Sequence, residues 1–293
     1  MIRFEFHEPA SLEEVVALLD HYGEEAAVLA GGTALLIDMR HGERQPGHLI
    51  SLWGTPQLAG LRWNGGLGIG ALTTVRQMAD ELESVQPMRG LVEAARLLGG
   101  LQVQNVATVG GNLCKASPGA DLAPPLLVLD ATLRLRGPGG ERTTPLEGFL
   151  TGPDRTDLRP AEVLTEIEVP ELPPQTGTSF LKVMRRHAVD CSIVAVAACV
   201  SLAEDGETAS QVRIALGAAA PAPFRAKRAE ELLTGAVLKP SLAREAARLA
   251  RDEARPISDV RASAEYRQML VEALVERAVL LAAERAKAAQ ERQ

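Results

Sequence analysis

The segment TVGGNLCKASPGAD, residues 108–121, sets a run of small residues between two apolar stretches. Its adjacent glycines, Gly110 and Gly111, carry no Cβ, so a ligand can approach the backbone closely. We therefore expect the N–H groups of Gly110, Gly111 and Asn112 to contact a diphosphate directly.

Asp121 closes this segment and precedes LAPPLLVLD, residues 122–130, which we expect to be a helix. Asp is a favoured N-cap residue, and Pro124 and Pro125 are tolerated only near the beginning of a helix. Helix capping is therefore the favoured interpretation of Asp121 taken alone. Contact with a bound ligand is the alternative.

A second glycine pair lies upstream in VLAGGTALLIDMR, residues 28–40, which reads as a strand, a tight turn and a helix. Gly31 and Gly32 permit the turn, and Thr33 is expected to cap the helix and offer its hydroxyl to an anion. Two such cradles on one chain suit a dinucleotide. The nearest match to G-x-G-x-x-G, GGLGIG at residues 65–70, leads into a strand and is set aside.

Composition limits the classes of protein. The 293 residues are 46% hydrophobic and 24% charged, which suffices for two or three domains. The net charge of −7 argues against a nucleic-acid partner, since such a partner requires clustered Lys and Arg. No apolar run approaches about 18 residues and the N-terminus lacks a signal-like apolar region, so we expect a cytoplasmic protein without a membrane span.

The three cysteines are too few for four-thiolate iron–sulfur ligation and lack C-x-x-C spacing. We expect Cys191 and Cys199 to pack as small apolar residues in strands. Cys114 lies inside the glycine segment, where reactivity of its thiol is left open. The chain also lacks the H-E-x-x-H, G-x-S-x-G and Walker patterns, so we assign it neither catalytic residues nor metal ligands.

The predicted helices and strands divide the chain into two regions. A β-α-β-α-β sequence fills roughly the first fifty residues. Further strands and helices then follow up to the proline-rich segment PELPPQTG, residues 170–177, where we place a domain boundary. Beyond it, three long strands with a hairpin near Asp205 and Gly206 predict an antiparallel sheet, and helices are expected near residues 225–234, 241–253 and 261–288.

Several motifs in order resemble the FAD-binding, or medium, subunit of the molybdenum hydroxylases, the family of xanthine and carbon monoxide dehydrogenases. The likeness covers almost the whole chain. It rests on AGGT (30–33), HLISL (48–52), IGALTT (69–74), QVQNVATVGGNLCKASPGAD (102–121), EVLTEIEVP (162–170), FLKVMRR (180–186) and ISDVRASAEYR (257–267). Two departures are Ala34, where a polar Asp or Ser is common, and Gln104, where an Arg often stands.

The resemblance implies an α+β fold. Residues 1–174 would form a two-part FAD-binding domain of the vanillyl-alcohol-oxidase-like (PCMH) type, with subdomains of about 1–56 and 57–174. Residues 175–293 would form a C-terminal domain with an antiparallel sheet and helices. The residues expected to bind FAD are Val28, Leu29, Ala30, Gly31, Gly32, Thr33, Ala34, Leu35, Leu98, Thr108, Val109, Gly110, Gly111, Asn112, Asp121, Leu164 and Lys182.

Three of these residues have an ordinary structural alternative. Leu98 is equally suited to a helix core, Leu164 to a buried strand, and Lys182 to a strand face in contact with solvent. As a flavin neighbour, Lys182 would lower the energy of an anionic reduced flavin through its charge.

By the same resemblance, this subunit passes electrons from [2Fe–2S] clusters of a small subunit through FAD to NAD, a quinone or oxygen, while a large molybdopterin subunit hydroxylates the substrate. A stand-alone flavin reductase and a non-enzymatic nucleotide sensor remain as alternatives. The helices after residue 225 are expected either to dock partners, with Arg261 and Arg267 at the surface, or only to cover the sheet.

Overall fold

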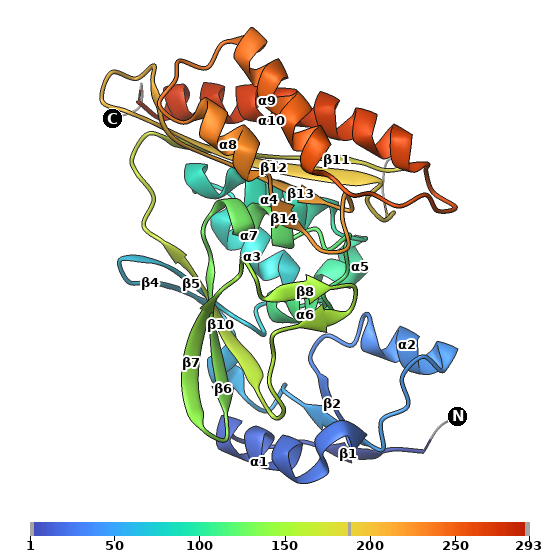
Figure 1. The fold of residues 1–293 in the computed structure, drawn as a ribbon. Helices are drawn as coiled ribbons and strands as arrows, with labels where there is room; N and C mark the ends of the chain where they lie inside the picture. The colour runs from blue at the N-terminus through green and yellow to red at the C-terminus, as the bar shows by residue number, and fades with distance from the viewer. Residues whose placement is uncertain (1–2, 187–188, 291–293) are drawn as a thin grey trace.

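A computed structural model describes residues 3–186 and 189–290 (Figure 1). The N-terminal part is a parallel three-stranded sheet in the order β1-β3-β2, as the β-α-β-α-β pattern predicted. Ser11 caps the first helix by accepting a hydrogen bond from the N–H of Glu14 at 3.2 Å. The elements are β1 (Glu5–His7), α1 (Leu12–Tyr22), β2 (Ala26–Leu29), α2 (Leu35–His41) and β3 (His48–Ser51).

The middle part is a five-stranded antiparallel sheet in the order β4-β5-β10-β6-β7, with helices packed beside it. Its strands are β4 (Leu61–Trp63), β5 (Gly66–Gly70), β6 (Thr132–Gly137), β7 (Gly140–Pro145) and β10 (Val163–Pro170), and β8 (Leu150–Gly152) pairs separately with β9 (Arg155–Thr156). Its helices are α3 (Val75–Leu82), α4 (Arg89–Leu97), α5 (Leu101–Gln104), α6 (Val109–Lys115) and α7 (Ala123–Val128).

The C-terminal part is the expected antiparallel sheet, in the order β11-β12-β13-β14. Helices α8 and α10 pack on one face of this sheet, with α9 against both of them, and α4 and α7 pack against the other face (Figure 1). Burial from both sides explains why all nine residues of β12 are buried. The elements are β11 (Thr176–Val183), β12 (Val194–Leu202), β13 (Ala209–Gly217), β14 (Phe224–Arg225), α8 (Lys227–Leu233), α9 (Pro240–Glu253) and α10 (Ala264–Gln290).

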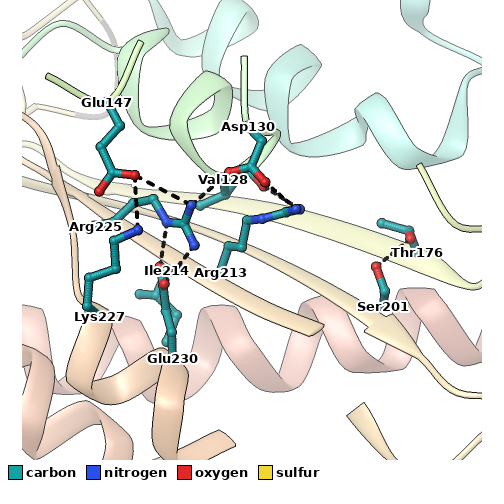
Figure 2. A network of polar contacts seen from close by, with 10 residues as sticks. All are labelled: Val128, Asp130, Glu147, Thr176, Ser201, Arg213, Ile214, Arg225, Lys227 and Glu230. Carbon is teal, nitrogen blue, oxygen red and sulfur yellow. Dashed lines mark hydrogen bonds and ion pairs between the residues drawn. The ribbon is translucent and has the colours of Figure 1, made fainter. Parts of the chain in front are cut away.

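A network of ion pairs joins α7 to this sheet (Figure 2). Asp130, just after α7, forms an ion pair with Arg213 of β13 and accepts a hydrogen bond from Arg225 of β14 at 2.7 Å. Arg225 also pairs with Glu230 at 2.7 Å, so each buried guanidinium has a carboxylate partner. Because an unpaired buried charge is costly, the network fixes how the sheet sits on the middle part.

Two expectations about the C-terminal part are wrong. Cys191 is exposed, and only Cys199 packs within a strand. Arg267 is 3% exposed, because its guanidinium donates to the carbonyl oxygens of Ile193 and Ala218 and pairs with Asp259. Within the described ranges, each helix is too short or too polar to cross a bilayer.

Candidate functional site

A cavity of about 480 Å³ lies between the N-terminal sheet and the α6–β10 region of the middle part. Its size is within the roughly 300–1,000 Å³ typical of small-molecule sites. Most of the residues predicted as a binding site meet here. Those lining it are Val28, Ala30, Gly31, Gly32, Thr33, Ala34, Leu35, Leu98, Thr108, Gly110, Gly111, Asn112 and Leu164, whereas Leu29, Val109, Asp121 and Lys182 do not line it.

The first glycine turn, residues 30–35, connects β2 to α2 and leaves its backbone donors free. Within the described part of the chain, the N–H groups of residues 31–35 donate to no protein acceptor. The predicted Thr33 cap is wrong, since Ala34 occupies the N-cap position and no side chain caps the helix. A run of unpaired N–H groups lining a cavity is a site for an anion such as a diphosphate.

Gly31 is required here by close packing. A Cβ built on it would lie 2.0 Å from the carbonyl oxygen of Val106, a backbone atom that cannot rotate away. Gly32 supplies a positive φ of 69° for the turn. The glycine pair therefore brings the free donors against the segment that leads into α6.

The second glycine turn, residues 108–112, is the first turn of α6 and not an open loop. Its N–H groups are already used: Gly110 donates to the carbonyl of Ala71 at 2.9 Å, Gly111 to Thr108 Oγ1 at 3.0 Å, and Asn112 to the carbonyl of Thr108 at 3.0 Å. The expectation that these three groups are free for a diphosphate is thus wrong in this structure. Thr108 is the N-cap of α6, and its side chain accepts the hydrogen bond from Gly111.

Both glycines of the second turn still shape the cavity, because the absence of a side chain lets neighbouring backbone and side-chain atoms pack close to them. A Cβ on Gly110 would lie 2.7 Å from the Cβ of Ala71, so this position packs α6 onto the end of β5. A Cβ on Gly111 would lie 2.8 Å from Thr108 Oγ1 and 3.9 Å from the Cβ of Ala30. The two turns therefore lie against each other in one wall of the cavity.

Asp121 does not cap a helix. The N-cap of α7 is Leu122 without a side-chain bond, and the N–H of Leu122 donates to Asn112 Oδ1 at 3.3 Å. The Asp121 carboxylate instead accepts from Lys182 Nζ at 2.8 Å and from Ser192 Oγ at 2.9 Å. Burial raises the pKa of Asp121, while the charge and hydrogen bond of Lys182 act in the opposite direction.

Lys182 therefore does not lie on a strand face in contact with solvent, which was one of the two alternatives. Its side chain is fully buried, and besides Asp121 it contacts the carbonyl of Leu97 at 3.4 Å. The next residue, Leu98, lines the cavity, and Gln104 holds that segment by donating to the Leu98 carbonyl at 3.1 Å. The buried ion pair thus supports the end of α4 behind the cavity wall.

Charged groups at the cavity were missed by the sequence reasoning. Lys115 of α6 reaches Asp38 of α2 at 2.8 Å and Asp154 at 3.2 Å. Burial works against its charge, but the two carboxylates hold the pKa of Lys115 above its ordinary value. Arg44 and Arg159 also line the cavity. A charge inside each of the apolar stretches LLIDMR and NLCKA was the available signal.

Cys114 lines the same cavity, next to Lys115. Burial raises the pKa of its thiol to about 12, so the reactive thiolate is suppressed. The reactivity left open at this position is therefore not supported.

Comparisons with known proteins agree with this geometry. A family described as the FAD binding domain in molybdopterin dehydrogenase matches residues 2–172, and one described as the CO dehydrogenase flavoprotein C-terminal domain matches residues 179–282. The chain belongs to this family of molybdenum hydroxylase flavoproteins. It is an FAD-binding subunit of an oxidoreductase complex, as the resemblance predicted.

The relatives described here match along almost their whole length. The carbon monoxide dehydrogenase medium chain of Hydrogenophaga pseudoflava is 35% identical over 282 residues, which are 94% of this chain and 96% of that one. The xanthine dehydrogenase FAD-binding subunit of Escherichia coli O157:H7 is 33% identical and covers 94% of both. A solved carbon monoxide dehydrogenase of H. pseudoflava superposes with a TM-score of 0.93 at 35% identity, over 97% of this chain and 99% of that one.

Proposed function

We propose that this flavoprotein subunit relays electrons from the [2Fe–2S] clusters of a small partner subunit, through FAD, to NAD, a quinone or oxygen. A large molybdopterin subunit would carry out the hydroxylation, and the assembly would be cytoplasmic. The observation that carries the proposal is the cavity with free backbone donors at residues 31–35, in a chain whose two parts both match flavoprotein families.

The residues present fit FAD. The free N–H groups of the first turn would hold the diphosphate, and the cations of Lys115, Arg44 and Arg159 would reduce its charge repulsion with Asp38. Apolar side chains such as Leu98 and Leu164 would contact the ring systems. Asp121 and Lys182, which do not line the cavity, would position the end of α4 and tune its electrostatics.

When bound, FAD supplies the redox chemistry, by taking up electrons singly and releasing them in pairs. The chain's own contribution is to bind and orient the cofactor and to exclude water from it. Around the cavity, Asp38 is paired with Lys115, and Glu162 is paired with Arg142. The hydrogen bond from Arg142 is the main reason that the pKa of Glu162 lies below its ordinary value, so the Glu162 carboxylate serves as an ion-pair partner more than as a proton donor.

Rapid-mixing absorbance measurements on the purified native complex test the relay. Substrate of the complex should bleach the flavin only when the small and large subunits are present, and the isolated flavin-loaded chain should hydroxylate nothing. Substrate turnover by the isolated chain would favour the stand-alone reductase. A flavin that neither NADH nor the reduced partners bleach would favour the sensor.

A further inference from the structure

Three side chains that do not line the cavity gather on one face of the N-terminal sheet. Glu5 and His7 lie two positions apart on β1, and Glu5 pairs in register with His48 on the adjacent parallel strand β3. Side chains two apart on a strand share a face, so the pairing brings all three together. One ligand atom from each lies within 4.8 Å of the other two.

The separations suit coordination of one small cation. His7 Nε2 lies 3.1 Å from His48 Nδ1, and His48 Nδ1 lies 3.5 Å from Glu5 Oε2. Ligand atoms about 2.0–2.1 Å from a tetrahedral ion are roughly 3.3 Å apart. Two imidazoles with one carboxylate form a ligand set for zinc and its divalent neighbours, whereas calcium and magnesium prefer oxygen ligands.

A neighbouring aromatic ring holds the site in shape. Tyr22, the last residue of α1, stacks on the ring of His48 with centroids 3.6 Å apart and an interplanar angle of 15°. The centroid of the Tyr22 ring lies 5.2 Å from that of the His7 ring. Partners that fix the orientation of imidazole rings strengthen metal binding. His7 and His48 are half-buried, whereas Glu5 is exposed.

We propose that Glu5, His7 and His48 bind one divalent transition-metal ion, with Zn²⁺ as the best match, and that this ion ties the edge strand β1 to β3. Sequence spacing alone predicted no metal ligands. It could not show this site, because His7 and His48 lie 41 residues apart and meet only through the pairing of β1 with β3. Since β1 pairs over only three residues, a cross-link to β3 would stabilise the N-terminal sheet.

Isothermal titration of the tag-free, flavin-loaded full chain with Zn²⁺ tests the proposal. We expect one ion per chain and a rise in the thermal midpoint of unfolding. His7→Gln and Glu5→Gln should each weaken binding at least about tenfold, the loss that even an outer-shell partner causes. His41→Gln, at the end of α2 and outside the cluster, is the matched control and should bind like the wild type.

The Glu5→Gln variant keeps the test decisive because Glu5 is exposed, and substitutions of exposed side chains usually change stability little. The flavin-to-protein ratio and far-ultraviolet circular dichroism confirm that each variant is folded. No saturable binding by the wild type, or wild-type affinity in either His7→Gln or Glu5→Gln, overturns the three-ligand site.

Discussion

The turn of residues 30–35 and the turn of residues 108–112 lie against each other in the cavity wall, with Gly31 packed on Val106 and Gly111 facing Ala30. Among the residues that the structure describes, the N–H groups of residues 31–35 in the first turn have no protein acceptor. The second has its N–H groups bonded to Thr108 and Ala71. Both glycine pairs thus permit close packing, but only the first also presents free donors.

This difference divides the work of the site. The first turn is suited to contact the anionic part of FAD, because its donors are available without breaking any protein hydrogen bond. The second turn is anchored from behind, since Asn112 holds the N–H of Leu122 and the adjacent Asp121 holds the buried Lys182. Variants of the two turns should therefore differ in whether they lose mainly cofactor or mainly stability.

The largest effect is expected from removing the anchor behind the second turn. Asp121→Asn leaves the fully buried ammonium of Lys182 without its carboxylate. Breaking a buried pair in this way costs about 3–5 kcal/mol of unfolding free energy. Urea unfolding of the flavin-loaded chain measures it.

The matched control is the double variant Asp121→Asn with Lys182→Met, which removes the orphaned charge and should recover much of the loss. If Asp121 acted as a helix cap, Asn would replace it with little change, because both residues cap well. A loss below about 1 kcal/mol would therefore restore the capping interpretation.

The next effect separates the two glycine turns directly. Gly31→Ala places a Cβ 2.0 Å from the carbonyl oxygen of Val106, and such overpacking costs about 1–3 kcal/mol. Displacing the first turn should also remove most bound flavin. In Gly111→Ala the clash is with the Thr108 hydroxyl, which can rotate away at the loss of its helix cap, so stability should fall while more flavin remains. The flavin-to-protein ratio and urea unfolding compare the two variants.

Gly119→Ala serves as the control, because a Cβ at that position meets no atom within 4 Å. Equal flavin content in the Gly31→Ala and Gly111→Ala proteins would contradict the division of roles between the turns.

Much of this architecture could be predicted from sequence because its signals are local. The β-α-β-α-β order, the capping of α1 by Ser11 and the antiparallel C-terminal sheet follow from periodicity and turn residues. The family motifs also predicted Leu98 and Leu164 as site residues, and both line the cavity, although nothing in the local sequence distinguishes them from core leucines. Here the resemblance supplied what periodicity lacks.

Several of the errors arose where a residue's partner is distant in sequence. Asp121 resembles an N-cap until its partners are seen to be Lys182, 61 residues away, and Ser192, 71 residues away. The donors of Gly110 look free until Ala71 is placed beside them. Arg267 resembles a surface charge, but it is buried against two carbonyl groups. Hydrogen-bond satisfaction depends on tertiary contacts, and a single sequence does not show these.

A smaller effect is expected from the charges next to the first turn. Lys115→Gln leaves Asp38 unpaired at the cavity, where its charge would repel the diphosphate. We expect FAD affinity to fall about tenfold, which corresponds to about 1.4 kcal/mol. Fluorescence titration of the deflavinated protein with FAD measures the dissociation constant.

Adding Asp38→Asn to Lys115→Gln should recover affinity, because the repelling charge is then removed as well. Affinity that falls equally in the single and double variants would show that Lys115 acts through contact with the cofactor and not by neutralising Asp38.

The smallest effect involves no loss of stability and tests whether the second turn is closed. Burial disfavours the charged thiolate, raising the pKa of Cys114 to about 12 and that of Cys199 to about 11, whereas Cys191 is exposed. Because this shift makes the Cys114 thiolate scarce at about pH 8, a fluorogenic alkylating reagent should label mainly Cys191 in the native chain and all three thiols in denaturant. Raising the pH toward 10 should increase the Cys114 thiolate, and so its labelling rate, about tenfold per pH unit while the fold holds.

Cys191→Ser is the control and should abolish native labelling. Rapid labelling of Cys114 at pH 8 in that variant, identified by peptide mass mapping, would show that the α6 turn opens to solvent and that its bonded N–H groups are available to a ligand after all.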